Sequence, residues 1–190
     1  MYRRLDGSHI VGDPARARAA VGREGRRVLI VSDRRIVLLL DVFDQAFDHR
    51  AWHGTPLWGA LRGLSHREAL WRPRRGRHNI WEIVLHTAYW KYIVRRRLTR
   101  DVALAFPRAG SNWPPLPAPA DARAWKRDVA LLREQHRLLR QAIARLPSSR
   151  LGARAWRSTW SNAANIFGIA SHDLYHAGQI QLVKRLQRGA

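Results

Sequence analysis

The sequence predicts an all-α fold, a bundle of four main helices with an irregular N-terminal extension. Four segments repeat apolar residues at helical spacing, and segments rich in proline, glycine or polar residues separate them. No two segments alternate apolar and polar residues as a convincing pair of strands would. With 190 residues, 46% of them hydrophobic, the chain is long enough to bury one core of this kind.

The first 35 residues differ in composition from the rest. The stretch "DPARARAAVGREGRRVLIVSDRR" is rich in Arg, Ala and Gly and has no sustained helical or strand period. We expect a poorly ordered extension over residues 1–35, in which "VLIV" is a candidate short strand. The bundle domain is then expected over residues 36–190.

The first long helix is predicted over residues 36–52. Leu39, Phe43 and Phe47 fall on one face of it, as an amphipathic helix requires. The stretch "HGTP" interrupts the pattern, and Pro56 suits the first position of a short helix in "PLWGALRGL". We expect a loop in "SHREALWRPRRGR".

Three more long helices complete the predicted bundle. "HNIWEIVLHTAYWKYIVRRRLT" predicts one that Asn79 caps, and "DARAWKRDVALLREQHRLLRQAIARL" predicts one that Asp121 caps and Pro147 stops. Between them, the prolines of "FPRAGSNWPPLPAPA" indicate a long linker. The last helix is expected over residues 163–186.

The composition narrows the chemistry and the location. Cysteine is absent, which excludes disulfides, thiolate metal sites and cysteine nucleophiles, and leaves histidines and carboxylates as the strong metal ligands. No apolar run approaches the roughly 18 residues of a membrane span. We expect no secretion signal and no membrane partner, and a cytoplasmic location.

The net charge of +21 raises the question of an anionic partner. Almost all of this charge is arginine, because lysine stands only at Lys91, Lys126 and Lys184, and a GC-rich genome alone can produce such a skew. We therefore favour a solvated surface and a small-molecule substrate over a nucleic-acid partner. The alternative is a basic nucleic-acid-binding or stress-response bundle with a non-catalytic metal site, and a homodimer stays open.

Two histidines in the last helix suggest metal chemistry. His172 and His176 stand four apart, so they project from one helical face, about 40° apart around the axis, and both can reach one ion. His86 is the candidate third ligand, since it lies mid-helix among apolar and aromatic residues. Three histidines would hold Zn²⁺ or a similar divalent ion and leave a coordination position open.

Two carboxylates near these histidines are candidate catalytic residues. Glu82 precedes His86 by one turn and could orient a ligand histidine, shuttle a proton or pair with an arginine. Asp173 takes the place of the glutamate in the H-E-x-x-H zinc motif, in which it would be the base. A structural hydrogen bond from Asp173 to a neighbouring helix is the other interpretation.

Three further residues are candidates for contacts with a cofactor or substrate. His49 and His53 form a second pair four apart at the end of the first predicted helix. They could line the same pocket, form a competing metal site, or simply interact with the helix dipole. Gln179 lies near the face of His172 and His176 and could contact a substrate.

The segments "HNIWEIVLHTAYWKYIVRRRL" and "GIASHDLYHAGQIQLVKRL" resemble the DinB-like superfamily, which includes the YfiT-like metal-dependent hydrolases and the bacillithiol- and mycothiol-dependent transferases. The resemblance spans about residues 37–186, and "HDLYHAGQI" is its most specific part. It implies an up-down four-helix bundle with a divalent metal held by three histidines, which fall on His86, His172 and His176.

The resemblance also implies two kinds of reaction. In some members the metal holds a low-molecular-weight thiol as its thiolate and so activates it for S-transfer, because coordination lowers the pKa of a thiol. Metal-activated water would instead make the protein a hydrolase. The expected metal is zinc, and nickel, manganese and iron also suit imidazole ligands.

Overall fold

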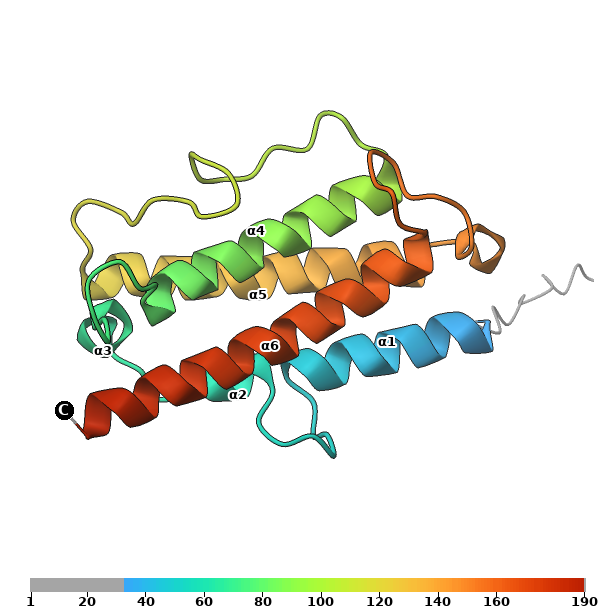
Figure 1. Cartoon of the computed structure of the whole chain (residues 1–190). Coiled ribbons are helices and arrows are strands. Elements are labelled where there is room, and N and C mark those ends of the chain that lie inside the picture. Colours follow the sequence, from blue (N-terminus) through green and yellow to red (C-terminus); the bar gives the residue numbers. More distant parts are fainter. Residues whose placement is uncertain (1–32, 190) are drawn as a thin grey trace, which may run out of the picture. The chain divides into compact units, whose positions relative to one another are not determined.

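The computed structural model describes residues 33–189. The candidate strand "VLIV" and nearly all of the predicted extension lie outside them. Residues 33–189 contain helices and no strand, so the predicted all-α fold is confirmed. The long helices are α1 (Arg34–Phe47), α4 (Ile80–Thr99), α5 (Ala122–Ala144) and α6 (Asn162–Arg188), and the short elements are α2 (Leu57–Ala60), α3 (His66–Leu70) and a 3₁₀ turn, Ser148–Arg150 (Figure 1).

The order of helix directions differs from simple up-down alternation. α4 and α5 run parallel to each other and antiparallel to α1 and α6 (Figure 1). Accordingly, the indole Nε1–H of Trp81, at the start of α4, donates a hydrogen bond to Oδ2 of Asp128, near the start of α5. The two atoms are 2.8 Å apart. The long proline-rich linker explains why α4 and α5 are parallel. It runs back along the full length of α4, so that α5 begins at the same end of the bundle as α4 (Figure 1).

The helix caps follow the polar residues that the sequence offers. The predicted caps Asn79 and Asp121 are confirmed, since their side chains accept the backbone N–H groups of Glu82 and Ala124 at 2.8 and 2.7 Å. Ser161 caps α6 in the same way, with its Oγ 3.1 Å from the N–H of Ala164.

Two predicted boundaries need correction. α1 ends at Phe47, five residues before the predicted end, because its apolar face stops there and the exposed Arg50 occupies the next position on it. α3 lies within the predicted loop. Ser65 and Glu68 form a capping box at its start, a pattern that the sequence "SHRE" contains.

Two clusters of buried apolar side chains hold the bundle together. One surrounds Trp81 and Leu132, and the other surrounds Phe43 and Leu139. α4 and α6 lie side by side and antiparallel, so that residues in the middle of α4 face residues in the middle of α6 (Figure 1). No helix within residues 33–189 has both the length and the hydropathy needed to cross a membrane.

Candidate metal centre

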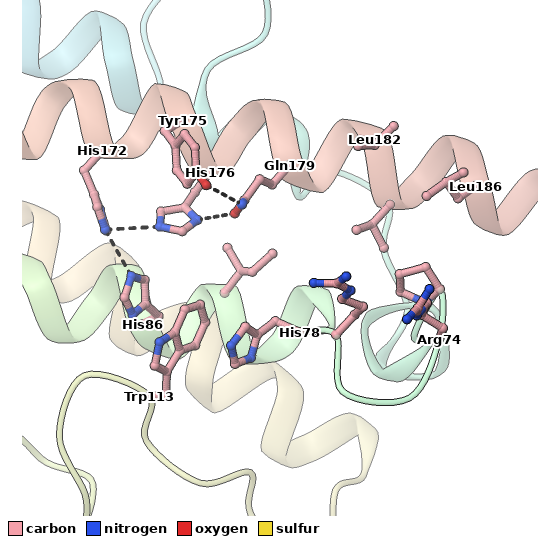
Figure 2. Close-up of a pocket in the computed structure, with 14 residues that line it drawn as sticks. Arg74, His78, His86, Trp113, His172, Tyr175, His176, Gln179, Leu182 and Leu186 are labelled. Carbon is pink, nitrogen blue, oxygen red and sulfur yellow. Dashed lines mark hydrogen bonds between the residues drawn. The ribbon is translucent and has the colours of Figure 1, made fainter.

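The three histidines singled out in the sequence meet in the groove between α4 and α6 (Figure 2). Nε2 of His172 lies 3.1 Å from Nε2 of His86 and 3.1 Å from Nε2 of His176. One ligand atom from each of the three residues lies within 4.8 Å of the others. Two helices far apart in the chain thus bring three imidazole nitrogens within 4.8 Å of one another.

Hydrogen bonds on the far side of two rings fix which nitrogen carries the proton. Nδ1 of His86 lies 2.7 Å from the carbonyl oxygen of Asn112, which can only accept, so this Nδ1 is the donor. Nδ1 of His176 donates to Oε1 of Gln179 at 2.7 Å, while the amide nitrogen of Gln179 donates to the Tyr175 hydroxyl at 3.0 Å. Both rings therefore direct an Nε2 lone pair at His172.

This donor set fits a divalent transition-metal ion. Two nitrogens bound to one ion at about 2.0–2.1 Å are about 2.8–3.4 Å apart at octahedral to tetrahedral angles. The two separations of 3.1 Å lie in that range. The Nε2 of a neutral His172 can donate a hydrogen to only one of the two facing lone pairs, whereas a cation satisfies all three nitrogens at once.

The environment keeps the three imidazoles in the form that binds metal. Burial, together with the neighbouring imidazoles, lowers the pKa of His172 to about 3 and that of His176 to about 4. Burial also lowers the pKa of His86. All three rings are therefore neutral near pH 7, and a metal ion does not have to displace a proton from them.

The long connection between α4 and α5 supplies two residues that sequence reasoning missed. Besides its bond to His86, Asn112 accepts the indole N–H of Trp90 through Oδ1 at 2.8 Å, and its φ of 56° is one that asparagine tolerates better than most residues. The ring of Trp113 stacks on that of His86, with centroids 3.8 Å apart. The only sequence signal was an Asn-Trp pair within a proline-rich linker.

A cavity of about 660 Å³ opens onto the three histidines. This volume suits a small molecule rather than a macromolecule. Arg74 and His78 lie at one part of the wall, and apolar side chains of α6 form another (Figure 2). Arg77 also lines the cavity. Gln179, a predicted substrate contact, lines this cavity together with Tyr175.

Of the three roles considered for Glu82, the structure has the pairing with an arginine. The carboxylate of Glu82 accepts hydrogen bonds from Nη2 and Nη1 of Arg72, at 2.5 and 2.7 Å, and from the backbone N–H of Asn79 at 3.0 Å. It also lies 3.2 Å from Nδ1 of His78. Glu82 is thus the capping-box residue of α4 and an ion-pair partner, and it does not line the cavity.

Asp173 and the second histidine pair also lie away from the cavity. Asp173 is fully buried and forms an ion pair with Lys91 of α4, the interhelical bond that the sequence left open. Because α1 is shorter than predicted, His49 and His53 lie beyond its end. His49 lines a separate cavity beside Asp44, and His53 is exposed.

Comparisons with known proteins agree with this architecture. A family model described as the DinB superfamily matches residues 50–180, well over half of the chain. Neither curated proteins nor solved structures give a match. The matched segment contains all three converging histidines and the groove between α4 and α6 that holds them. The chain belongs to the DinB superfamily.

Proposed function

We propose that this protein is a metal-dependent enzyme in which His86, His172 and His176 hold one divalent ion, with zinc as the expected metal. The observation that supports this most directly is the pair of 3.1 Å separations among three Nε2 atoms, two of which present lone pairs. A structural zinc site usually has four protein ligands, whereas three leave room for a reactant. The cavity beside these atoms can admit that reactant.

The proposed reaction is nucleophilic attack by a low-molecular-weight thiol or by water. A divalent ion at this centre would lower the pKa of either nucleophile and so make it reactive at neutral pH. Residues of the chain orient two of the proposed ligand rings. Asn112 accepts the Nδ1–H of His86, and Gln179 accepts the Nδ1–H of His176. Arg74 and Arg77 line the cavity and give it a positive charge that suits an anionic reactant.

The test is elemental analysis of the untagged protein after divalent ions are supplied and the excess is removed. We expect about one ion per chain in the wild-type protein, and none in His86→Ala or His172→Ala. His53→Ala is the matched control, because His53 is exposed and outside the cavity, and it should keep the ion. Circular dichroism of each variant checks that the helices persist.

A folded wild-type protein that takes up no divalent ion would overturn the proposal. If His53→Ala loses the ion as well, the ligand set is different from the one proposed. Once loading is established, thiols including bacillithiol and mycothiol are tested with an electrophile such as chlorodinitrobenzene, and water is tested with aryl esters. Turnover that depends on the thiol supports a transferase, and ester cleavage without thiol supports a hydrolase.

A further inference from the structure

The groove between α4 and α6 continues beyond the histidines into a second cavity of about 550 Å³. The first cavity is lined by α4 residues up to His86 and by α6 residues from His172 onward. The second is lined by α4 residues from Trp90 onward and by residues up to His172 on the α6 side. His172 therefore separates two cavities and contributes to the wall of each.

The walls of the second cavity are mainly apolar. Trp90 and Ile169 lie along it, and Phe167 and Trp160 keep 47% and 67% of their surface exposed at its edge. Large apolar side chains left in water are surfaces that a ligand can cover with a gain in free energy. The volume lies within the usual range of sites for small molecules.

One cationic side chain, that of Arg97, lines this mainly apolar cavity. Among the residues of 33–189 that line the second cavity, Arg97 is the single lysine or arginine, and there is no aspartate or glutamate. Burial lowers the pKa of Arg97, which reflects the loss of water around its charge. Within residues 33–189, Arg97 forms no ion pair with a carboxylate. A partly desolvated guanidinium without a counter-charge favours an anionic ligand.

The Arg97 side chain is held in position by its neighbours. Its Nη1 donates to Oδ1 of Asn165 at 3.1 Å, and the guanidinium lies 5.8 Å from the ring centroid of Trp90. Asn165 is itself fixed, because its amide nitrogen donates to the carbonyl oxygen of Ser161 at 2.9 Å. A guanidinium ordered before binding loses less entropy when it takes up a ligand.

We propose that the second cavity is a binding site for an apolar carboxylic acid with an aromatic-sized body. The carboxylate pairs with Arg97, whose planar fork matches two carboxylate oxygens. The hydrocarbon body packs on Trp90 and Phe167. Binding does not require the metal ion. In the proposed reaction, this acid would be the second reactant and would reach His172 from the side opposite the first cavity. This role for the acid rests on the proposed function.

The test is calorimetric titration of the metal-depleted full chain with 2-naphthoate and with its neutral isostere 2-naphthamide. We expect 2-naphthoate to bind, and to bind about 10- to 100-fold more tightly than the amide. Arg97→Gln should reduce the affinity for 2-naphthoate to that for the amide. Arg74→Gln, which removes an arginine of the first cavity, should leave it unchanged.

A blocking variant locates the ligand independently of charge. Gly168 lines the second cavity, and a Cβ built on it meets no atom of residues 33–189 within 4 Å, so the side chain of Gly168→Leu can begin there without a clash at Cβ and adds bulk to the wall. Gly178→Leu is the matched control, since Gly178 is also in α6, has the same free space and lines neither cavity. We expect only Gly168→Leu to prevent binding.

Three results would overturn this inference. They are the absence of 2-naphthoate binding at millimolar concentration, equal affinity for the acid and the amide, and a loss of binding in Arg74→Gln equal to that in Arg97→Gln. Each is independent of the metal centre, because the titration uses metal-depleted protein. A protein that binds 2-naphthoate as expected and takes up no metal would sustain the second site and refute the proposed function.

Discussion

The carbonyl oxygen of Asn112 accepts the Nδ1–H of His86 at 2.7 Å, across 26 positions of sequence. A loop without regular structure therefore orients a residue in the middle of α4. The same asparagine binds Trp90 through its side chain, so its backbone is anchored on the helix that carries His86. Partners that orient a metal-binding histidine typically change metal affinity by 10- to 100-fold when they are lost.

We predict that Asn112→Ala weakens metal binding by about 10-fold, because it removes the bond to Trp90 and disfavours the φ of 56° that aims the carbonyl at His86. Asn112→Gly is the informative control, since glycine adopts this φ freely and loses only the side-chain bond. It should retain more affinity than the alanine variant in a chelator competition. Equal losses would show that the backbone conformation is unimportant.

Gln179 accepts the Nδ1–H of His176, just as Asn112 accepts that of His86. We predict that Gln179→Leu weakens metal binding by about 10- to 100-fold, because Nδ1–H of His176 loses its acceptor. Gln179→Glu keeps an acceptor at this position and should keep the affinity or raise it. Competition with a chelator measures both variants. If the leucine variant binds metal as tightly as the wild-type protein, the hydrogen bond has no part in orienting the ring.

Local periodicity was sufficient to predict the long helices and to place His172 and His176 on one face. These features depend on residues within one or two turns of each other. The candidate third ligand, His86, could be proposed because a histidine in an apolar stretch of helix needs a partner. Its position opposite α6 was then implied by the family resemblance and is what the structure has.

The features that sequence reasoning missed depend on distant contacts. A linker can be identified by its prolines, but its length alone does not say that it returns along α4 and makes α5 parallel to it. Asn112 and Trp113 reach the site only because of that path. Glu82 and Asp173 have the right spacing for catalysis, yet Arg72, in the loop before α4, and Lys91, on another helix than Asp173, bind their carboxylates.

The buried pair of Lys91 and Asp173 provides a stability prediction. Both side chains are fully buried, and Nζ of Lys91 also lies 4.8 Å from the ring centroid of Phe43. Lys91→Met should lower the free energy of unfolding by about 3–5 kcal/mol, because it leaves the Asp173 carboxylate unpaired in the core. Lys91→Met combined with Asp173→Leu should cost less than the two single changes together, as measured by urea denaturation. Additive losses in this double-mutant cycle would contradict the pairing.

His136 predicts how stability depends on pH. Its ring stacks on Phe47 and Phe43, with centroids 3.7 and 4.4 Å away, and its Nε2 lies 3.7 Å from Oδ1 of Asp44, too far for a hydrogen bond. Burial is the main cause that lowers the pKa of His136 to about 4; the carboxylate of Asp44 opposes this shift, and the positive charges of Lys91 and Arg140 add to it. The folded protein thus favours the neutral imidazole over the charged one.

Between about pH 6.5 and pH 4 the unfolded chain binds a proton at His136 that the folded protein does not. The free energy of unfolding should therefore fall as the pH is lowered through this window, by about 3 kcal/mol from this residue, and His136 should add nothing to the pH dependence above it. His136→Gln, measured by urea denaturation with excess chelator, should flatten the profile in this window, whereas His49→Gln, at an exposed position, should not. Parallel profiles for the wild-type protein and His136→Gln would refute the prediction. Because His172 and His176 are the same in all three proteins, the difference between profiles isolates the buried imidazole.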